Sequence, residues 1–482
     1  MKRTITWLAC LLCSLLPAGA APVRPNLLFI LTEDQGAHLG FAGTPGIQTP
    51  HMDALAASGV YFNNAFVVYP VCSASKAALL TGLHSHANGL LNNTVNYHKP
   101  AGQLTPPELQ NSLYRANRVK AVLPSLIERL HEAGYYQGVT HKLHVAPNEK
   151  FPYNEFLQQN SRQAVTGFIR RAGKAGKPWH LFFNIPQSHR PYPDSSKVKI
   201  QVDPATVKLP AYIPDTPVVR QDWAEYLAAI GEADRSVGEG LAALRESGQE
   251  KNTLIVFLGD HGPAFQHGKM TLYDAGLRTP LLIRLPGQAG GFRTDALASS
   301  VDLTPTVLDL LGLPALPASH SLSLRPVLEG RPGAKAHDCV FAAISHRGPL
   351  PNEGMQERSV SDGRWHLIYR EKLSPPWRQV QADSKEWTTW GNRTYAETVK
   401  SKEQFPDPFR ILAEMDPQSL GGKVPALELY DLQHDPDEMK NLAADPAARP
   451  ELMRLYAALR TWAQETADPG VQLPGSPPSS QE

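Results

Sequence analysis

Short apolar runs alternate with longer stretches of helical periodicity along most of the chain. Four runs rich in β-branched or aromatic residues predict buried strands, over Asn26–Leu31, Tyr135–Thr140, His180–Asn184 and Thr253–Gly259. Between and after them, apolar residues at helical spacing predict helices, over Thr49–Ser58, Ala121–Ala133, Asp222–Arg245 and Asp302–Gly312. Strands that alternate with helices indicate an α/β fold, in which a large and mostly parallel sheet is flanked by helices.

The pattern changes after about residue 350. Ser359–Tyr369 alternates like one strand, Leu427–Leu432 like another, and Pro450–Ala467 has the periodicity of a helix. We therefore expect a first domain over residues 21–350 that holds the functional site, and a smaller C-terminal α+β domain over residues 351–470. Residues 471–482 are rich in Pro, Ser and Gly and are expected to form a disordered tail.

The N-terminus has the three parts of a secretory signal peptide. Lys2 and Arg3 precede the apolar run Ile5–Leu16, and small residues follow at Pro17–Ala20. The run is shorter than the about 20 apolar residues that a membrane span needs. We predict a signal peptide over residues 1–20 and an exported protein, periplasmic or secreted, with no membrane partner.

The charge balance narrows the possible partners. The chain has 47 Lys and Arg against 46 Asp and Glu residues, which gives a net charge of +1. Proteins that bind nucleic acid need clustered positive charge, so that class of partner is not expected. A hydrophobic fraction of 42% is enough for large cores and excludes wholesale disorder. The oligomeric state stays open.

The positions of the cysteines matter more than their number. Of the four, Cys10 and Cys13 would leave with the signal peptide, so Cys72 and Cys339 remain. The two could pair, or each could be free, and a free cysteine in an oxidising compartment is a candidate reactive group. We interpret Cys339 as a buried apolar residue and Cys72 as the candidate nucleophile.

Each predicted strand runs directly into polar residues that can do chemistry. In open α/β sheets, sites form outside the carboxyl ends of the strands. A single polar residue there is most often a turn or cap residue, but four strand ends together indicate a site. The residues are Glu33 and Asp34, Lys142 and His144, His189, and Asp260 and His261.

Four of these residues offer the donor atoms of a metal site. Glu33, Asp34 and Asp260 have carboxylate oxygens, and His261 adds an imidazole nitrogen. An oxygen-dominated set favours calcium, magnesium or manganese, while the imidazole keeps zinc open. Adjacent carboxylates repel each other and raise a pKa unless a cation lies between them.

The segment Cys72–Gly82 predicts a helix with a reactive start. Ser73 or Ser75 can cap this helix, and Gly82 can end it. Cys72 would lie at the positive end of the helix dipole, where a thiolate or an anionic substrate is stabilised. Lys76 follows one turn later, where its ammonium could pair with the nucleophile or the substrate.

These residues resemble the motifs of the sulfatase family, in the alkaline phosphatase superfamily. Cys72–Lys76 is similar to the family's C-x-P-S-R signature, with Ala74 for Pro and Lys76 for Arg, and Leu79–Leu83 fits its L-x-T-G pattern. Further similar elements are Thr32–Asp34, Lys142–His144, His189–Pro191, Asp260–Gly262 and Lys269 within Gly268–Tyr273. The resemblance runs from about Pro25 to the C-terminus and is strongest to the sulfamidase branch.

The resemblance implies an alkaline-phosphatase-like fold, a formylglycine and one metal ion. A formylglycine-generating enzyme would oxidise Cys72 to formylglycine, which hydrates to a diol whose oxygen attacks sulfur. One divalent cation, expected to be Ca²⁺ with Mg²⁺ or Mn²⁺ as alternatives, would be bound at this centre. The ligand set implied for it is Glu33, Asp34, Cys72 in its modified form, Asp260 and His261.

The resemblance also implies roles for the cationic side chains. Lys76 and the metal would lower the pKa of the attacking hydroxyl, while Lys142 and Lys269 would neutralise the sulfuryl oxygens. His189 or Lys269 would protonate the leaving group. His144 would take a proton as sulfate leaves.

Three functions fit these residues. The first is an exported sulfatase that acts on a sulfated carbohydrate, of N-sulfoglucosamine type or O-sulfated. The second is a phosphodiesterase or phosphonate hydrolase of the same superfamily, with which the Asp260-His261 pair is compatible. The third is a sulfated-glycan-binding protein without catalysis, because Ala74 and Lys76 depart from the recognition signal of the oxidising enzyme and Cys72 could stay a thiol.

Overall fold

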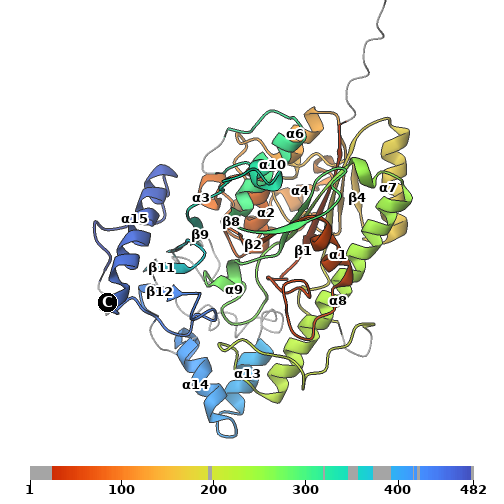
Figure 1. Ribbon diagram of the computed structural model, residues 1–482. Helices are drawn as coiled ribbons and strands as arrows, with labels where there is room; N and C mark the ends of the chain where they lie inside the picture. Colours follow the sequence, from red (N-terminus) through yellow and green to blue (C-terminus); the bar gives the residue numbers. More distant parts are fainter. Residues whose placement is uncertain are drawn as a thin grey trace, which may run out of the picture.

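The computed structural model describes residues 24–193, 198–317, 321–345, 356–372, 392–415, 417–420 and 424–478 (Figure 1). The predicted signal peptide lies outside these residues, as does the end of the predicted tail. Within these ranges, no helix has the length and apolar character needed to cross a membrane.

A sheet of eight strands forms the centre of the larger part of the molecule. Its order is β4-β3-β5-β1-β6-β7-β2-β8. All neighbours pair in parallel except β7, which is antiparallel to β6 and β2. The predicted α/β fold with a mostly parallel sheet is therefore confirmed. The strands are β1 (Asn26–Thr32), β2 (Val60–Phe66), β3 (Tyr136–Thr140), β4 (Glu155–Leu157), β5 (Trp179–Ile185), β6 (Thr253–Gly259), β7 (Leu281–Arg284) and β8 (Phe292–Ser299).

Helices cover this sheet. The longer ones are α1 (Pro50–Ser58), α2 (Cys72–Thr81), α6 (Leu126–Glu132), α7 (Arg162–Lys174), α8 (Pro217–Glu246) and α10 (Leu303–Leu310). Short helices are α3 (Ser85–Asn88), α4 (Pro106–Leu109), α5 (Ser112–Ala116), α9 (Asp274–Leu277) and α11 (Arg325–Leu328). Single 3₁₀ turns cover Ala101–Gln103, Asn148–Lys150, Glu250–Asn252, Ser300–Asp302, Pro417–Leu420 and Pro446–Ala448.

Two apolar cores lie on the two faces of the large sheet. Side chains alternate between the faces of a strand, so Leu27, Phe29 and Leu31 of β1 pack into one core with α2, α6 and α10. Leu28 and Ile30 pack into the opposite core with α1, α7 and α8. A strand that is buried on both faces must be apolar at nearly every position, which explains the continuous apolar runs that predicted the central strands.

Helix ends differ from the predictions where a cap decides them. Helix α8 begins at Pro217, well before the predicted Asp222, because the Thr216 side chain accepts a hydrogen bond from the Val219 amide. Helix α6 begins only at Leu126, because Ser125 forms a capping box there. A capping residue lies just before the helix and bonds to its first amides. Apolar periodicity does not detect this residue, so it misplaces the start of a capped helix.

A second, antiparallel sheet has the order β12-β11-β10-β9 and lies with helix α15 at one side of the molecule (Figure 1). Leu452, Leu455 and Leu459 of α15 pack on Leu367 and Leu429 of this sheet. Strand β9 pairs with β10 although it precedes residue 350. The elements are β9 (Val340–Ser345), β10 (Gln356–Ser361), β11 (Trp365–Lys372), β12 (Leu427–Asp431), α13 (Asn392–Lys400), α14 (Pro406–Met415) and α15 (Arg449–Glu465).

The prediction of one strand over Ser359–Tyr369 is wrong, because a tight turn divides it into β10 and β11. Asp362 accepts hydrogen bonds from the Arg364 and Trp365 amides at 2.9 and 2.7 Å. Gly363 has a φ of 91°, a conformation that glycine adopts without strain. The Asp-Gly pair is the turn signal that the alternation concealed.

A buried ion pair fixes the end of helix α15 to the small sheet. Arg358 of β10 is fully buried, and its Nη2 donates to Asp468 Oδ1 at 2.8 Å. Burial alone would raise the pKa of Asp468, but the Arg358 guanidinium holds this pKa below its usual value. The pair therefore stabilises the fold above the unfolded carboxyl pKa of about 3.9, and this stability is lost as the pH falls through the lower folded pKa.

We expect Asp468→Asn to destabilise the protein by about 3–5 kcal/mol at pH 7, because Arg358 would keep a buried, uncompensated charge. Thermal melts should show a lower Tm at pH 7, and the deficit should shrink as the pH falls below about 4. Asp215→Asn is the matched control, since its pair with Arg220 is half-exposed and contributes about 1 kcal/mol or less. Equal Tm values for Asp468→Asn and wild type at pH 7 would contradict the prediction.

Candidate active site

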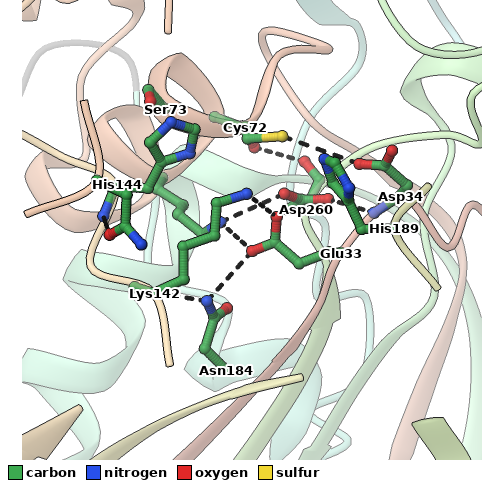
Figure 2. A network of polar contacts seen from close by, with 12 residues as sticks. Glu33, Asp34, Cys72, Ser73, Lys142, His144, Asn184, His189 and Asp260 are labelled. Atoms are coloured by element: carbon green, nitrogen blue, oxygen red, sulfur yellow. Dashed lines mark hydrogen bonds and ion pairs between the residues drawn. The ribbon is translucent and has the colours of Figure 1, made fainter. Parts of the chain in front are cut away.

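The carboxyl ends of four adjacent strands, β3, β5, β1 and β6, meet the start of helix α2 in a buried polar cluster (Figure 2). Parallel strands bring these groups together because their carboxyl ends share one edge of the sheet. Every residue that we predicted for the site lies in this cluster: Glu33, Asp34, Cys72, Lys76, Lys142, His144, His189, Asp260, His261 and Lys269.

Cys72 is the first residue of α2 and is 1% exposed. Its Sγ lies 3.2 Å from His261 Nε2 and 3.8 Å from Asp34 Oδ1. Burial opposes ionisation of the thiol, but the charges of Lys142 and Lys269, followed by His261, hold the pKa of Cys72 well below its usual value. An anionic group at this position is therefore stabilised by its surroundings.

The predicted cap of this helix is wrong, because Ser73 and Ser75 lie inside its first turns and the residue before it is Val71. Ser75 instead donates to the Asp260 carbonyl at 2.6 Å, and Ser73 Oγ accepts from the Thr94 amide at 3.1 Å. The two serines thus fix α2 against its neighbours. The predicted end is confirmed, with Gly82 in a left-handed conformation.

The candidate metal ligands form two overlapping groups. Asp34 and Cys72 belong to both groups, one completed by Glu33 and His189 and the other by Asp260 and His261. In each group the donor atoms lie within 4.8 Å of one another. His189 was not predicted as a ligand. A backbone hydrogen bond joins two of these residues, since the Asp34 amide donates to Asp260 Oδ1 at 2.8 Å. Asp34 has a φ of 50°.

The chemistry of this donor set fits a divalent cation. Glu33, Asp34 and Asp260 are at most 1% exposed, and burial raises the pKa of Asp260 to about 7, with the Glu33 carboxylate adding to the rise. A cation between these groups would remove the penalty. Carboxylates joined by one imidazole suit Ca²⁺, Mg²⁺ or Mn²⁺.

Three ammonium groups, of which those of Lys76 and Lys269 are buried and that of Lys142 is partly exposed, balance the three carboxylates. Lys142 Nζ lies 2.6 Å from Glu33 Oε2, and Lys269 Nζ lies 2.9 Å from Asp34 Oδ2. Lys76 forms an ion pair with Glu33 and lies 3.5 Å from Asp260 Oδ2. Lys76 therefore contacts the candidate metal ligands, while its pairing with the nucleophile or the substrate stays a prediction. Burial alone would raise the pKa of Glu33, but the ammonium groups of Lys142 and Lys76 hold this pKa well below its usual value.

The two histidines of the cluster have opposite environments. Burial and then Lys142 lower the pKa of His144 to about 4, and its Nε2 lies 2.8 Å from the Thr94 carbonyl. Asp34 raises the pKa of His189, whose Nε2 lies 3.4 Å from Lys269 Nζ. His144 is thus neutral at pH 7, while His189 is the histidine that favours its protonated form.

Two supporting residues were missed from the sequence. Asn184, near the end of β5, donates to Glu33 Oε1 at 3.2 Å and to the Lys142 carbonyl at 3.0 Å (Figure 2). Ser188 donates to the Glu33 carbonyl at 2.5 Å. An asparagine at the end of an apolar strand was the available signal, since a buried amide needs partners.

A sheet edge that gathers carboxylates, ammonium groups and a thiol with a lowered pKa defines an enzyme that acts on an anionic group. The sulfatase family model matches residues 25–313, which include the whole cluster. The chain belongs to the sulfatase family and is a sulfatase enzyme.

Relatives match the chain over nearly its full length. Human N-sulphoglucosamine sulphohydrolase is 30% identical, over 95% of this chain and 94% of its own. An ulvan-active sulfatase of Formosa agariphila is 29% identical, over 94% of this chain and 77% of its own. Both are similar to this chain along the catalytic part and the C-terminal part alike.

Solved structures share the fold. A sulfatase of glycosaminoglycan metabolism from Bacteroides thetaiotaomicron superposes with a TM-score of 0.66 at 16% identity, covering 92% of this chain and 97% of its own. The phosphonate monoester hydrolase of Agrobacterium radiobacter gives 0.62 at 18% identity, covering 92% and 96%. At such identities the likeness concerns the fold alone.

Proposed function

We propose that this sulfatase removes sulfate from a sulfated carbohydrate, with an N-sulfoglucosamine-type sugar as its substrate. The observation that carries the proposal is the full-length similarity to human N-sulphoglucosamine sulphohydrolase, combined with the charged cluster around Cys72. The site suits a compact tetrahedral anion, because the start of the ten-residue helix α2 and the ammonium groups of Lys142 and Lys269 converge there.

Two groups would complete the site. A divalent cation, which we propose to be Ca²⁺ held by Glu33, Asp34, Asp260 and His261, would supply Lewis-acid charge next to Cys72. Formylglycine derived from Cys72 would supply the nucleophilic oxygen. The positive charges that lower the pKa of the Cys72 thiol would stabilise an anionic oxygen at the same place as well as a thiolate.

The chain's own side chains would bind the sulfuryl group and move the protons. Lys142 and Lys269 would neutralise the sulfuryl oxygens, while Lys76, together with Lys142, keeps Glu33 ionised. His189, with its raised pKa, would donate a proton to the leaving group. His144, neutral at pH 7, would accept the proton released when sulfate departs.

Phosphonate or phosphodiester hydrolysis is the second candidate. Asp260 and His261 supply the aspartate–histidine pair common in metal-dependent phosphate enzymes, and the fold is shared with a phosphonate monoester hydrolase. Release of sulfate and of phosphate should be compared on N- and O-sulfated disaccharides and on matched phosphate esters and phosphonates. We expect the N-sulfated disaccharide to be hydrolysed fastest. A higher kcat/KM on the phosphorus substrates would reverse the order of the two candidates.

The state of Cys72 is tested by peptide mass spectrometry. After expression in a host with a formylglycine-generating enzyme, we expect the peptide that contains Cys72 to have lost sulfur and gained oxygen. The peptide with Cys339 should keep its thiol and is the internal control, since that half-buried thiol has a pKa raised by burial. An unmodified Cys72 in protein without turnover, but with retained glycan binding, would favour a binding protein instead.

A further inference from the structure

Arg190, the residue after His189, makes contacts through all three nitrogens of its guanidinium and with two aromatic rings. Nη1 and Nη2 donate to the two oxygens of Asp222 at 2.8 and 2.7 Å, and Nε donates to the Ala264 carbonyl at 3.2 Å. The rings of Tyr192 and Phe265 lie over it, with their centres 4.3 and 4.6 Å from Cζ. The planar, forked guanidinium is the one side chain that can make all these contacts at once.

These contacts join three segments around the site. Arg190 belongs to the loop between β5 and α8, and its carbonyl accepts a hydrogen bond from His189 Nδ1. Ala264 belongs to the loop after β6, the same loop that positions Lys269. Asp222 lies on helix α8, which packs on the sheet. Arg190 thus ties the loop of His189 to the loop of Lys269, and both to a rigid helix.

We propose that Arg190 and Asp222 are positioning residues that fix His189 against Lys269 for protonation of the leaving group. The inference rests on the proposed function of His189 as the proton donor. Neither residue touches the reacting atoms, and the ion pair acts by holding the 3.4 Å separation of His189 Nε2 and Lys269 Nζ. Displacements of about 1 Å in such groups are enough to slow a reaction by about 100-fold.

The leaving group makes this role distinguishable from a merely structural one. A sugar nitrogen or alkoxide is a strong base and must be protonated as it departs, whereas the phenolate of an aryl sulfate departs with little help. A displaced His189 therefore slows hydrolysis of a sulfated sugar much more than hydrolysis of an aryl sulfate. A general loss of folded protein lowers both rates equally.

The test is the double variant Arg190→Met with Asp222→Leu, since apolar residues of similar size often replace a buried ion pair without loss of folding. We expect kcat on an N-sulfated disaccharide to fall about 10- to 100-fold with little change in KM, and kcat on 4-nitrophenyl sulfate to fall about threefold or less. Arg220→Met with Asp215→Leu removes a half-exposed pair at the start of the same helix and is the matched control. It should leave both rates unchanged.

A crystal structure of the double variant gives a readout that needs no activity. We expect His189 Nε2 to lie beyond hydrogen-bond distance of Lys269 Nζ. An unmoved His189, or equal losses of kcat on both substrates, would overturn the inference. If the double variant does not fold, Arg190→Lys replaces it in the test. Lysine keeps the positive charge but lacks the forked guanidinium, so the ratio of the two rates should shift in the same direction. A wild-type protein that releases sulfate from neither substrate would refute the proposed function, while the position of His189 in the variant would still decide the role of Arg190.

Discussion

Cys72→Ala should lower sulfate release by about 10⁴-fold or more, the scale of loss when an enzyme loses its covalent nucleophile. Cys72 lies at the first turn of α2, within reach of His261 and the ammonium groups of Lys142 and Lys269. Alanine removes both the thiol and the formylglycine that would replace it. Sulfate released from an N-sulfated disaccharide, measured by ion chromatography, gives the rate for each variant.

Cys339→Ala is the matched control, because Cys339 is also a free cysteine but packs against the core of the small sheet. It should keep wild-type kcat/KM, and both variants should keep the wild-type Tm within a few degrees. If Cys72→Ala retained a rate within about tenfold of wild type, Cys72 would not be the nucleophile and the reaction would have to start from another group.

The place of the site could be predicted because residues that directly follow the strands of a parallel sheet all lie at the same edge of that sheet. The apolar runs that form β1, β3, β5 and β6 end where the polar residues begin, and the carboxyl ends of parallel strands share one edge. No knowledge of side-chain geometry was needed for this step. The same logic explains why Glu33 and Asp260, which are 227 residues apart in the chain, share a site.

What could not be predicted depends on contacts between distant segments. From helical spacing alone, the Lys76 ammonium was expected to pair with the nucleophile or the substrate. In the structure it forms ion pairs with the buried carboxylates of Glu33 and Asp260. Ser75 donates to the Asp260 carbonyl rather than capping its own helix. In each case a partner from another strand satisfies a buried polar group, and sequence spacing does not reveal such partners.

The acid and base roles of the two histidines also depend on contacts that the sequence does not reveal. By residue type alone, His144 and His189 are equivalent candidates for acid and base, and only the resemblance to the sulfatase family implied different roles. Their difference comes from neighbours: burial and Lys142 lower the pKa of His144, while Asp34 raises that of His189. An assignment of roles therefore needs the charges that the fold brings to each ring.

Asp260→Asn should remove most of the divalent metal binding, because it deletes one of the two buried carboxylates in the group of candidate ligands formed by Asp34, Cys72, Asp260 and His261. We expect the affinity for Ca²⁺, measured by calorimetry on chelator-treated protein, to fall by about 100-fold or more, and sulfate release to fall with it. Bound metal stabilises the folded state by mass action. The Tm of the wild type should therefore fall on chelation and recover with added Ca²⁺, while the Tm of Asp260→Asn should respond little.

Asp234→Asn separates loss of a ligand from loss of a buried aspartate. Asp234 is 1% exposed, as is Asp260, but it accepts hydrogen bonds from the His51 and Met52 amides at the start of α1. Its replacement should lower the Tm and leave Ca²⁺ affinity unchanged. Wild-type affinity in Asp260→Asn would mean that the metal binds without Asp260. A wild-type Tm that does not respond to the chelator would mean that Lys76 and Lys269 already balance these carboxylates without a metal ion.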